Sequence, residues 1–589
     1  MSADKLCGGT LSEAERAAVA SVDEAAIATD LQWFSQLGLR LAGTAGEHAG
    51  AAYVRDRMLE AGIACDLESY EGWVSYGDVP ERFGPATVTL AGGDVIAGKI
   101  YAFGGSTPDD GVRGELVDVG TGTPEEVAAL DLRGKIALSE LSMDAPHGEP
   151  VRVAGDAGAL GIVISNWSDA IGRVVHTGTA RGIWGNPTPA DLLVESRIPV
   201  VSVAFEDGAR LRALAAQHAS ARLDVRTHAQ WATSVQPIAE IPGNSSDDFV
   251  LVYCHLDTYG AGMTDNTTGV VGLMELARRL HERRDELRRG VRLAWFAGHE
   301  MPYNGSTHHL DAHWDALRDH CVAVVNADSW AIDGSLDSIL TWGFAETESF
   351  AVAAADDVLG VATGFEDFDA REAEQSFWAL GVPSWMVFSI AAHYPGGLAY
   401  LGPYWHSEQD VLEYVDQPAL AQLTAVYVLS LMRLCAAPVL PFRYAPLARR
   451  LAGLLDGLAD EHPDAVAWDG LRAAAQRFDI AARAADEALD AGSASGDGAD
   501  ALLISVAHTI NPVVYTVGGQ YAQDPSSASH LRKRLPGLQR ALAGVAAGDP
   551  LEGPAWRTVA MRERNRTTDA LLRAAALLDV ISRPRGQAR

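Results

Sequence analysis

Three short apolar runs in the middle of the chain have the pattern of buried strands. They cover residues 249–254, 291–296 and 321–325, and each is apolar almost throughout instead of alternating with polar residues. Continuous apolar runs of this length are typical of parallel strands that are covered on both faces. Between the first two runs, Val270–Leu287 has apolar residues at helical spacing. The order strand, helix, strand predicts an α/β domain with a mostly parallel sheet.

The remaining sequence differs in pattern on either side of this unit. Residues 12–64 have helical periodicity, and residues 76–234 have short strands that alternate with glycine-rich turns. We therefore divide the chain into the first part of the α/β domain (1–75), a β-rich insert (76–234), the second part of the α/β domain (235–440) and a helical region (441–589). Five helices are predicted in the helical region, near 446–459, 465–490, 499–511, 530–547 and 556–581.

Each of the three apolar runs is followed by side chains that can bind a metal ion. His255 and Asp257 follow the first run, His299 and Glu300 follow the second, and Asp328 follows the third. Parallel strands place their carboxyl ends at one edge of the sheet, where α/β proteins bind ligands. Imidazole and carboxylate together suit zinc and similar divalent ions. Two further candidates stand outside the strands, Asp265 before the predicted helix and His406 much later.

The order and spacing of these residues resemble the co-catalytic two-zinc aminopeptidase family, which also contains glutamate carboxypeptidase II and the transferrin receptor. The matching segments are His255-Leu256-Asp257, Asp265-Asn266, Gly298-His299-Glu300 with Asn304-Gly305-Ser306, Asp328, and Trp405-His406-Ser407 with Asp410. The resemblance implies a three-layer αβα domain with a mixed, mostly parallel sheet. It also implies two divalent metal ions, of which zinc is the first expectation and manganese, cobalt and iron are the alternatives.

The resemblance also implies a role for each matching residue. His255, Asp265 and Asp328 would hold one ion, and Asp265 would bridge to a second ion that Glu300 and His406 complete. Asp257 would orient His255, because imidazoles that bind metals usually donate their other N–H to a second group.

The residue before Glu300 departs from the family pattern. The family has a second glutamate there, which acts as the general base, whereas this chain has His299. Histidine has an ordinary pKa of about 6.5 and can accept a proton near neutral pH. We therefore expect a metal-dependent hydrolase that cleaves an amide C–N bond, either an aminopeptidase or a small-molecule amidohydrolase, with His299 as the base. Two alternatives remain, a specialised pathway enzyme with a non-peptide substrate and a receptor-like relative without catalysis.

The segment that leads to His406 borders the substrate pocket in the family. Residues 389–405 contain no arginine or lysine, which argues against an acidic substrate, because guanidinium groups usually bind such carboxylates. Tyr404, Trp405 and His393 are the candidate substrate contacts, and they favour a neutral or aromatic group. The alternative is that the aromatic rings pack in the core and that the histidine is simply exposed.

The insert and the helical region carry weaker resemblances. The segments 132–138 and 158–164 resemble a protease-associated domain, which either covers the metal site and shapes the pocket or is a passive module. Residues 510–521 resemble the C-terminal dimerisation domain of glutamate carboxypeptidase II and the transferrin receptor. By that analogy the protein is a homodimer. The alternative is a helical cap on a single chain.

Composition narrows the expected partners and location. The formal net charge of −32 argues against binding to nucleic acid, which needs a basic surface. The sequence shows no secretory signal and no uninterrupted apolar run of about 18 residues. We therefore expect a cytoplasmic protein without a membrane partner, acting on a small peptide or amide. The five cysteines are scattered and have no CxxC spacing, so Cys254 and Cys321 are expected to be core thiols.

Overall fold

The computed structural model describes residues 11–78, 84–142, 144–145, 148–182, 184–195, 198–334, 339–368, 375–389, 394, 401–494, 496–522 and 534–583. An eight-stranded sheet lies at its centre, with the strand order β1-β9-β11-β10-β12-β15-β13-β14. The strands are β1 (Ala64–Tyr76), β9 (His228–Ile241), β10 (Phe249–His255), β11 (Gly290–Phe296), β12 (Cys321–Asn326), β13 (Ile339–Gly343), β14 (Gly364–Asp367) and β15 (Ser384–Ser389).

The middle of this sheet is parallel. β10 pairs in parallel with β11 and β12, and β12 pairs in parallel with β15. The antiparallel pairs lie further out, where β9 joins β11 and β13 joins β15. The mixed, mostly parallel sheet predicted from the sequence is confirmed, and its three predicted strands are β10, β11 and β12.

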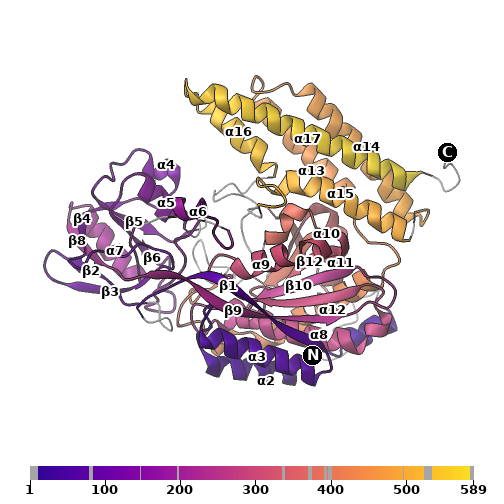
Figure 1. The fold of residues 1–589 in the computed structure, drawn as a ribbon, viewed down its shortest axis with the longest axis horizontal. Coiled ribbons are helices and arrows are strands. Elements are labelled where there is room, and N and C mark those ends of the chain that lie inside the picture. The colour runs from indigo at the N-terminus through magenta and orange to yellow at the C-terminus, as the bar shows by residue number, and fades with distance from the viewer. Residues whose placement is uncertain are drawn as a thin grey trace.

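Helices cover both faces of the sheet, which explains why these strands are apolar throughout. Alternate residues of β10 enter two different cores, Val250, Val252 and Cys254 in one and Phe249, Leu251 and Tyr253 in the other. The first core is closed by α8 (Thr268–Glu282) and α12 (Gln417–Ala436), and the second by α9 (Asn304–Ala312) and α10 (Trp314–His320). Figure 1 shows α8 and α9 on opposite sides of the sheet. The three-layer αβα arrangement is confirmed.

Helix α12 is apolar and lies in the core. Among the described residues, it is the one helix whose length and hydropathy would suit a membrane span, but 83% of its apolar window is buried inside the molecule. It packs against α8 and against α11 (Glu348–Leu359). Cys254 and Cys321 are buried in the core, as predicted.

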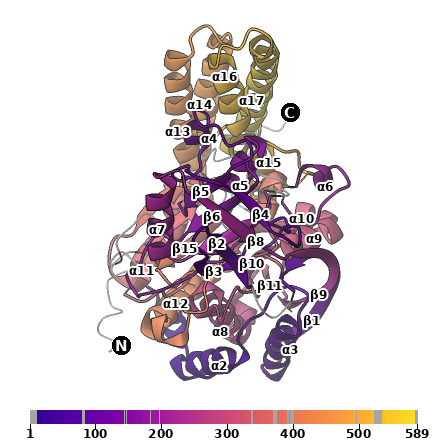
Figure 2. The ribbon, with the colours of Figure 1, turned by 90° about the vertical axis from the view of Figure 1, so that its left-hand side faces the viewer.

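The insert is a closed barrel with the strand order β2-β3-β7-β6-β5-β4-β8. Its strands are β2 (Ala86–Leu90), β3 (Val95–Ile100), β4 (Val112–Asp118), β5 (Ile136–Glu140), β6 (Gly161–Ser165), β7 (Val200–Val203) and β8 (Ser220–Asp224). β1 and β9 form a long antiparallel ribbon that leads from the sheet to the barrel, with Tyr76 opposite His228 at the barrel end. Seen from the barrel side, the barrel lies in front of the sheet and below the C-terminal helices (Figure 2).

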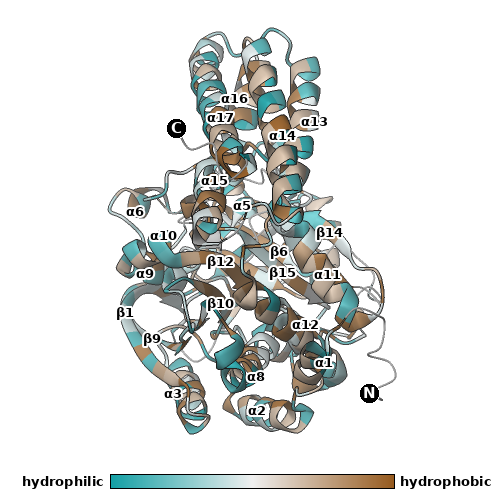
Figure 3. Ribbon diagram, turned by 90° about the vertical axis from the view of Figure 1, so that its right-hand side faces the viewer, coloured by the Kyte–Doolittle hydropathy of each residue, from teal (hydrophilic) through white to brown (hydrophobic). Residues whose placement is uncertain are grey.

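The described part of the C-terminal region forms a bundle of five helices, which lies above the sheet (Figure 3). They are α13 (Ala445–Glu461), α14 (Asp469–Asp490), α15 (Asp497–Tyr515), α16 (Pro536–Ala546) and α17 (Glu552–Ser582). Helix α15 continues past its predicted end at 511 with Pro512 inside it. The continuation is fixed by tertiary packing, because the ring of Tyr515 stacks on Phe344 of the α/β domain with 3.8 Å between ring centroids.

Glu346 lies buried where the α/β domain meets α15. Its Oε1 accepts a hydrogen bond from Asn511 Nδ2 at 2.7 Å, whereas Oε2 is buried without a hydrogen-bond partner. Burial raises the pKa of Glu346 to about 7, from an ordinary value of 4.5. The folded protein therefore holds this proton more tightly than the unfolded chain does.

This difference predicts a pH-dependent stability. The free energy of unfolding should fall as the pH rises from 4.5 through 7, because ionisation is opposed only in the folded state. Glu346→Gln should remove this component, so that the variant melts like the parent protein at pH 5 and at a higher temperature at pH 8. Thermal denaturation at both pH values measures the effect, with the exposed Glu487→Gln as the matched control. An equal difference in Tm at the two pH values would contradict the assignment.

Candidate metal centre

The central strands bring the predicted ligands to one edge of the sheet. His255 is the last residue of β10, Glu300 follows β11 in the loop 297–300, and Asp328 follows β12. Since β10 lies between β11 and β12, these three side chains are neighbours. Asp265 comes from the turn before α8, and His406 comes from the segment before α12.

Asp265 lies between the two histidines and faces each with a different oxygen. Its Oδ1 is 3.0 Å from His255 Nε2, and its Oδ2 is 3.2 Å from His406 Nε2. Asp328 Oδ1 lies 3.5 Å from His255 Nε2, and Glu300 Oε1 lies 3.2 Å from His406 Nε2. The five predicted ligands thus form two groups that share Asp265.

Burial and neighbouring charges shift the pKa values of the two histidines in this cluster. Burial alone would lower the pKa of His255, but the charge of Asp328 and the hydrogen bond with Asp265 outweigh it and raise the pKa well above its usual range. Burial opposes protonation of His406 in the same way, yet the charge of Glu300 and the hydrogen bond with Asp265 raise its pKa to about 9. The carboxylates therefore favour positive charge between them, which divalent ions would supply.

The residues present fit a pair of divalent metal ions. Glu300 Oε1 is buried and accepts no hydrogen bond, although it faces the His406 ring. His255, Asp265 and Asp328 would hold one ion, and Asp265, Glu300 and His406 the other. Nitrogen and oxygen donors of this kind suit zinc.

The carbonyl and the carboxylate of Asp257 contact different parts of the site. Its carboxylate Oδ1 is 3.9 Å from His255 Nδ1, whereas its own backbone carbonyl lies 2.9 Å from that nitrogen. The two carboxylate oxygens instead accept the backbone N–H groups of His299 and Glu300, each at 3.0 Å. Asp257 therefore contacts the His255 ring through its backbone carbonyl, and its expected role in orienting His255 stays a prediction. The carboxylate is a positioning group for the loop that carries Glu300.

His299 lies beside the first group of ligands. Its ring stacks on His255 with 4.0 Å between centroids and an interplanar angle of 12°, and it meets the edge of Tyr303 at 4.7 Å. Ligand atoms of His255, His299 and Asp328 all lie within 4.8 Å of one another. The side chain in the general-base position is thus close enough to exchange a proton with a molecule bound at this centre.

Two further residues hold Asp265 in place, a role that the sequence did not predict for either of them. The carboxylate of Asp410 accepts the N–H groups of Thr264 at 2.8 Å and Asp265 at 3.1 Å. Trp405 Nε1 donates a hydrogen bond to Asp265 Oδ2 at 2.5 Å. The only sequence signal for Asp410 is its place four residues after His406 in the matching segment.

The predicted substrate contacts are not supported by their positions. Tyr404 has no exposed surface and stacks on Tyr414 with 4.1 Å between ring centroids, so the expectation that it contacts substrate is corrected to a core position. Trp405 is 8% exposed, and its indole N–H donates a hydrogen bond to Asp265. Trp405 therefore holds the candidate ligand Asp265 in place. His393 lies outside the described residues.

The barrel domain contacts the metal centre directly. The backbone N–H of Thr177 donates to the carbonyl of His406 at 2.9 Å, and the ring of His176 stacks on His406 at 5.2 Å. Trp184 stacks on Tyr303 at 3.8 Å. Of the two roles considered for the insert, these contacts favour the one in which it covers the site.

Comparison with known families agrees with this arrangement. Residues 237–430 match the profile of peptidase family M28, and residues 112–211 match that of the PA domain. Over the first of these ranges, the chain is similar to peptidase family M28. The predicted metallopeptidase and protease-associated domains are thereby confirmed, whereas the closer likeness to glutamate carboxypeptidase II and the transferrin receptor stays a prediction.

Curated relatives match part of the chain. Leucine aminopeptidase 2 of Trichophyton equinum is 29% identical over 226 residues, which are 36% of this chain and 41% of the relative. Leucine aminopeptidase 2 of Arthroderma otae is 28% identical over 233 residues, which are 38% and 43% of the two chains. The chain thus spans about two fifths of the length of the curated relatives it matches.

Solved structures share the fold. A zinc aminopeptidase from Bacillus subtilis has a TM-score of 0.54 and 21% identity, over 69% of this chain and 94% of its own. An M28 peptidase precursor from Shewanella amazonensis has a TM-score of 0.56 and 20% identity, over 74% and 96%. These structures therefore share the fold of this chain over nearly their whole length.

The position of Asp257 predicts a specific defect in metal binding. Asp257→Asn should weaken zinc binding by about 10–100-fold, because an amide NH2 would face one of the two backbone N–H groups and displace the Glu300 loop. Titration of metal-free protein with zinc measures the loss. Asp500→Asn is the matched control, since Asp500 is also buried but pairs with Arg289 elsewhere. Equal zinc affinity in Asp257→Asn and the parent protein would contradict this role.

Proposed function

We propose that the protein is a metal-dependent aminopeptidase that hydrolyses the amide bond after the first residue of a small peptide or a related amide. The observation that carries this proposal is the position of the Asp265 carboxylate between His255 and His406, with one oxygen toward each imidazole. The M28 profile match and the leucine aminopeptidase names of the relatives support it.

The metal ions and the protein would divide the chemistry between them. When bound, two divalent ions, zinc by expectation, polarise the scissile carbonyl and make hydroxide available near neutral pH. His299 would accept the proton of the attacking water and pass it to the departing nitrogen. Asp257 would hold the backbone of His299 in the position from which its ring can do so.

The substrate group is proposed to be neutral or aromatic, because residues 389–405 contain no arginine or lysine that could pair with a carboxylate. Tyr303 meets the His299 ring edge-on and stacks on Trp184. Because these two side chains are only 6% and 7% exposed, we assign them to the support of the base position and not to contact with substrate.

The oligomeric state and location expected from the sequence stay predictions. Helix α17 carries partly exposed apolar side chains at Val559, Met561, Leu572 and Val580, which offer apolar surface for contact with a second subunit. A homodimer in the cytoplasm is the arrangement we retain.

The proposal predicts hydrolysis of aminoacyl amides that depends on both metal and His299. With zinc, manganese or cobalt added, leucyl and phenylalanyl amides should be cleaved, and His299→Ala should lower kcat by about 10²–10⁴-fold. His299→Glu should keep activity with an acid limb at lower pH, because glutamate has an ordinary pKa of about 4.3 and histidine of about 6.5.

The control variant is His281→Ala, on α8 away from the centre, which should leave the rate and its pH profile unchanged. Metal-loaded protein that cleaves no amide in the panel would contradict the proposed function. An unchanged kcat in His299→Ala, with hydrolysis intact, would assign the base to another residue.

A further inference from the structure

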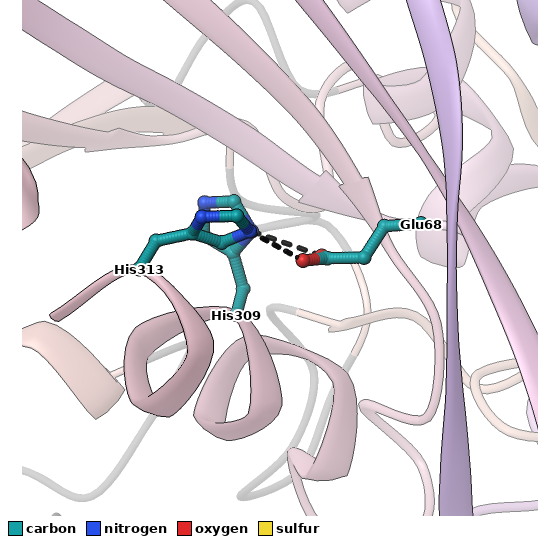
Figure 4. Close-up of side chains that lie close together, drawn as sticks. All are labelled: Glu68, His309 and His313. Atoms are coloured by element: carbon teal, nitrogen blue, oxygen red, sulfur yellow. Dashed lines mark hydrogen bonds and ion pairs between the residues drawn. The ribbon is translucent and has the colours of Figure 1, made fainter.

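A second cluster of histidine and carboxylate lies between β1 and α9. Glu68 extends from β1 toward His309 of α9 and toward His313 just after it, and both imidazoles turn to the same carboxylate (Figure 4). His309 Nδ1 is 2.9 Å from Glu68 Oε2, and His313 Nε2 is 2.6 Å from Glu68 Oε1. The histidines share one face because they are four residues apart on a helical turn, which the 3.0 Å hydrogen bond from His313 N to His309 O continues.

These three side chains form a set of metal donors. Their ligand atoms lie within 4.8 Å of one another, with none shared with the candidate metal centre. Two imidazoles and one carboxylate are the donors of a common zinc site, in which water takes the fourth position. The His309 side chain is 1% exposed and that of His313 is 44% exposed, so an ion would rest on the buried imidazole and meet solvent on the His313 side.

The carboxylate of this cluster is held in place by a buried amide. Gln236 has no exposed surface, and its Nε2 donates to Glu68 Oε2 at 2.6 Å and to the carbonyl of Gly305 at 3.2 Å. Metal ligands are usually fixed by such outer hydrogen bonds. The same Gln236 accepts the N–H of Ala297 through Oε1 at 3.3 Å, which ties the cluster to the loop that carries Glu300.

We propose that Glu68, His309 and His313 bind one divalent transition-metal ion of the zinc type. The ion would fasten β1 to α9 and, through Gln236, steady the loop from Ala297 to Glu300. Its binding does not depend on the proposed function, because none of the three residues belongs to the candidate metal centre. The competing explanation is a clasp of hydrogen bonds alone, which would hold the same elements without an ion.

Zinc binding by the full chain distinguishes these explanations. In a His255→Ala/His406→Ala double variant, which removes imidazoles from the candidate metal centre, metal-free protein titrated with zinc should still bind one equivalent. Adding His313→Ala or Glu68→Gln should weaken that binding at least about tenfold. Adding His320→Ala, a partly exposed histidine on α10 outside the cluster, should leave it unchanged.

Thermal denaturation gives a second readout on the same proteins. Zinc should raise the Tm of the double variant and not that of the His313→Ala triple variant, because an ion stabilises only the state that binds it. If the double variant does not fold, His313→Ala in the otherwise unchanged chain should lose one zinc equivalent. No zinc retained by a folded double variant, or equal zinc binding with and without His313, would overturn the site. Loss of hydrolysis with this equivalent intact would instead count against the proposed function alone.

Discussion

The structure depends on one buried carboxylate, that of Asp265, which is shared by two imidazoles. Its two oxygens lie 3.0 Å from His255 Nε2 and 3.2 Å from His406 Nε2. A buried carboxylate is costly unless it is paired and hydrogen-bonded. The chain meets this requirement with the Trp405 indole N–H and with Asp410, which holds the backbone of Asp265. The parallel strands then supply the remaining ligands from their carboxyl ends.

Two parts of the chain complete the centre together. The sheet provides His255, Glu300 and Asp328, whereas His406 stands in a segment that also contacts the barrel domain, through its carbonyl and Thr177 N. The barrel is joined to the sheet by the β1–β9 ribbon (Figure 2). A movement of the barrel relative to the sheet would therefore shift the backbone of one metal ligand, which couples the position of the domain to the geometry of the centre.

The apolar patterns of the sequence predicted those elements whose residues are buried in a regular order along the chain. The strands β10, β11 and β12 and the helix α8 were predictable because burial on both faces leaves continuous apolar runs. The convergence of the five candidate ligands was predictable because strand ends and family spacing mark them. The contacts of Asp257 were not, because they depend on the backbone path of the loop that follows β11. Tyr404 is buried by packing against distant parts of the chain, which the residues next to it in the sequence do not indicate. The cluster of Glu68 and His309 joins residues 241 positions apart, with no spacing signal.

The central claim is that Asp265 joins two metal-binding groups. Diffraction from crystals of the zinc-loaded protein, measured on both sides of the zinc absorption edge, locates each bound ion by its anomalous signal. We expect two peaks that flank the Asp265 carboxylate, one in contact with His255 and Asp328 and the other with Glu300 and His406. Loaded crystals with no peak at Asp265, or with a single ion that leaves His406 and Glu300 without metal contact, would contradict it.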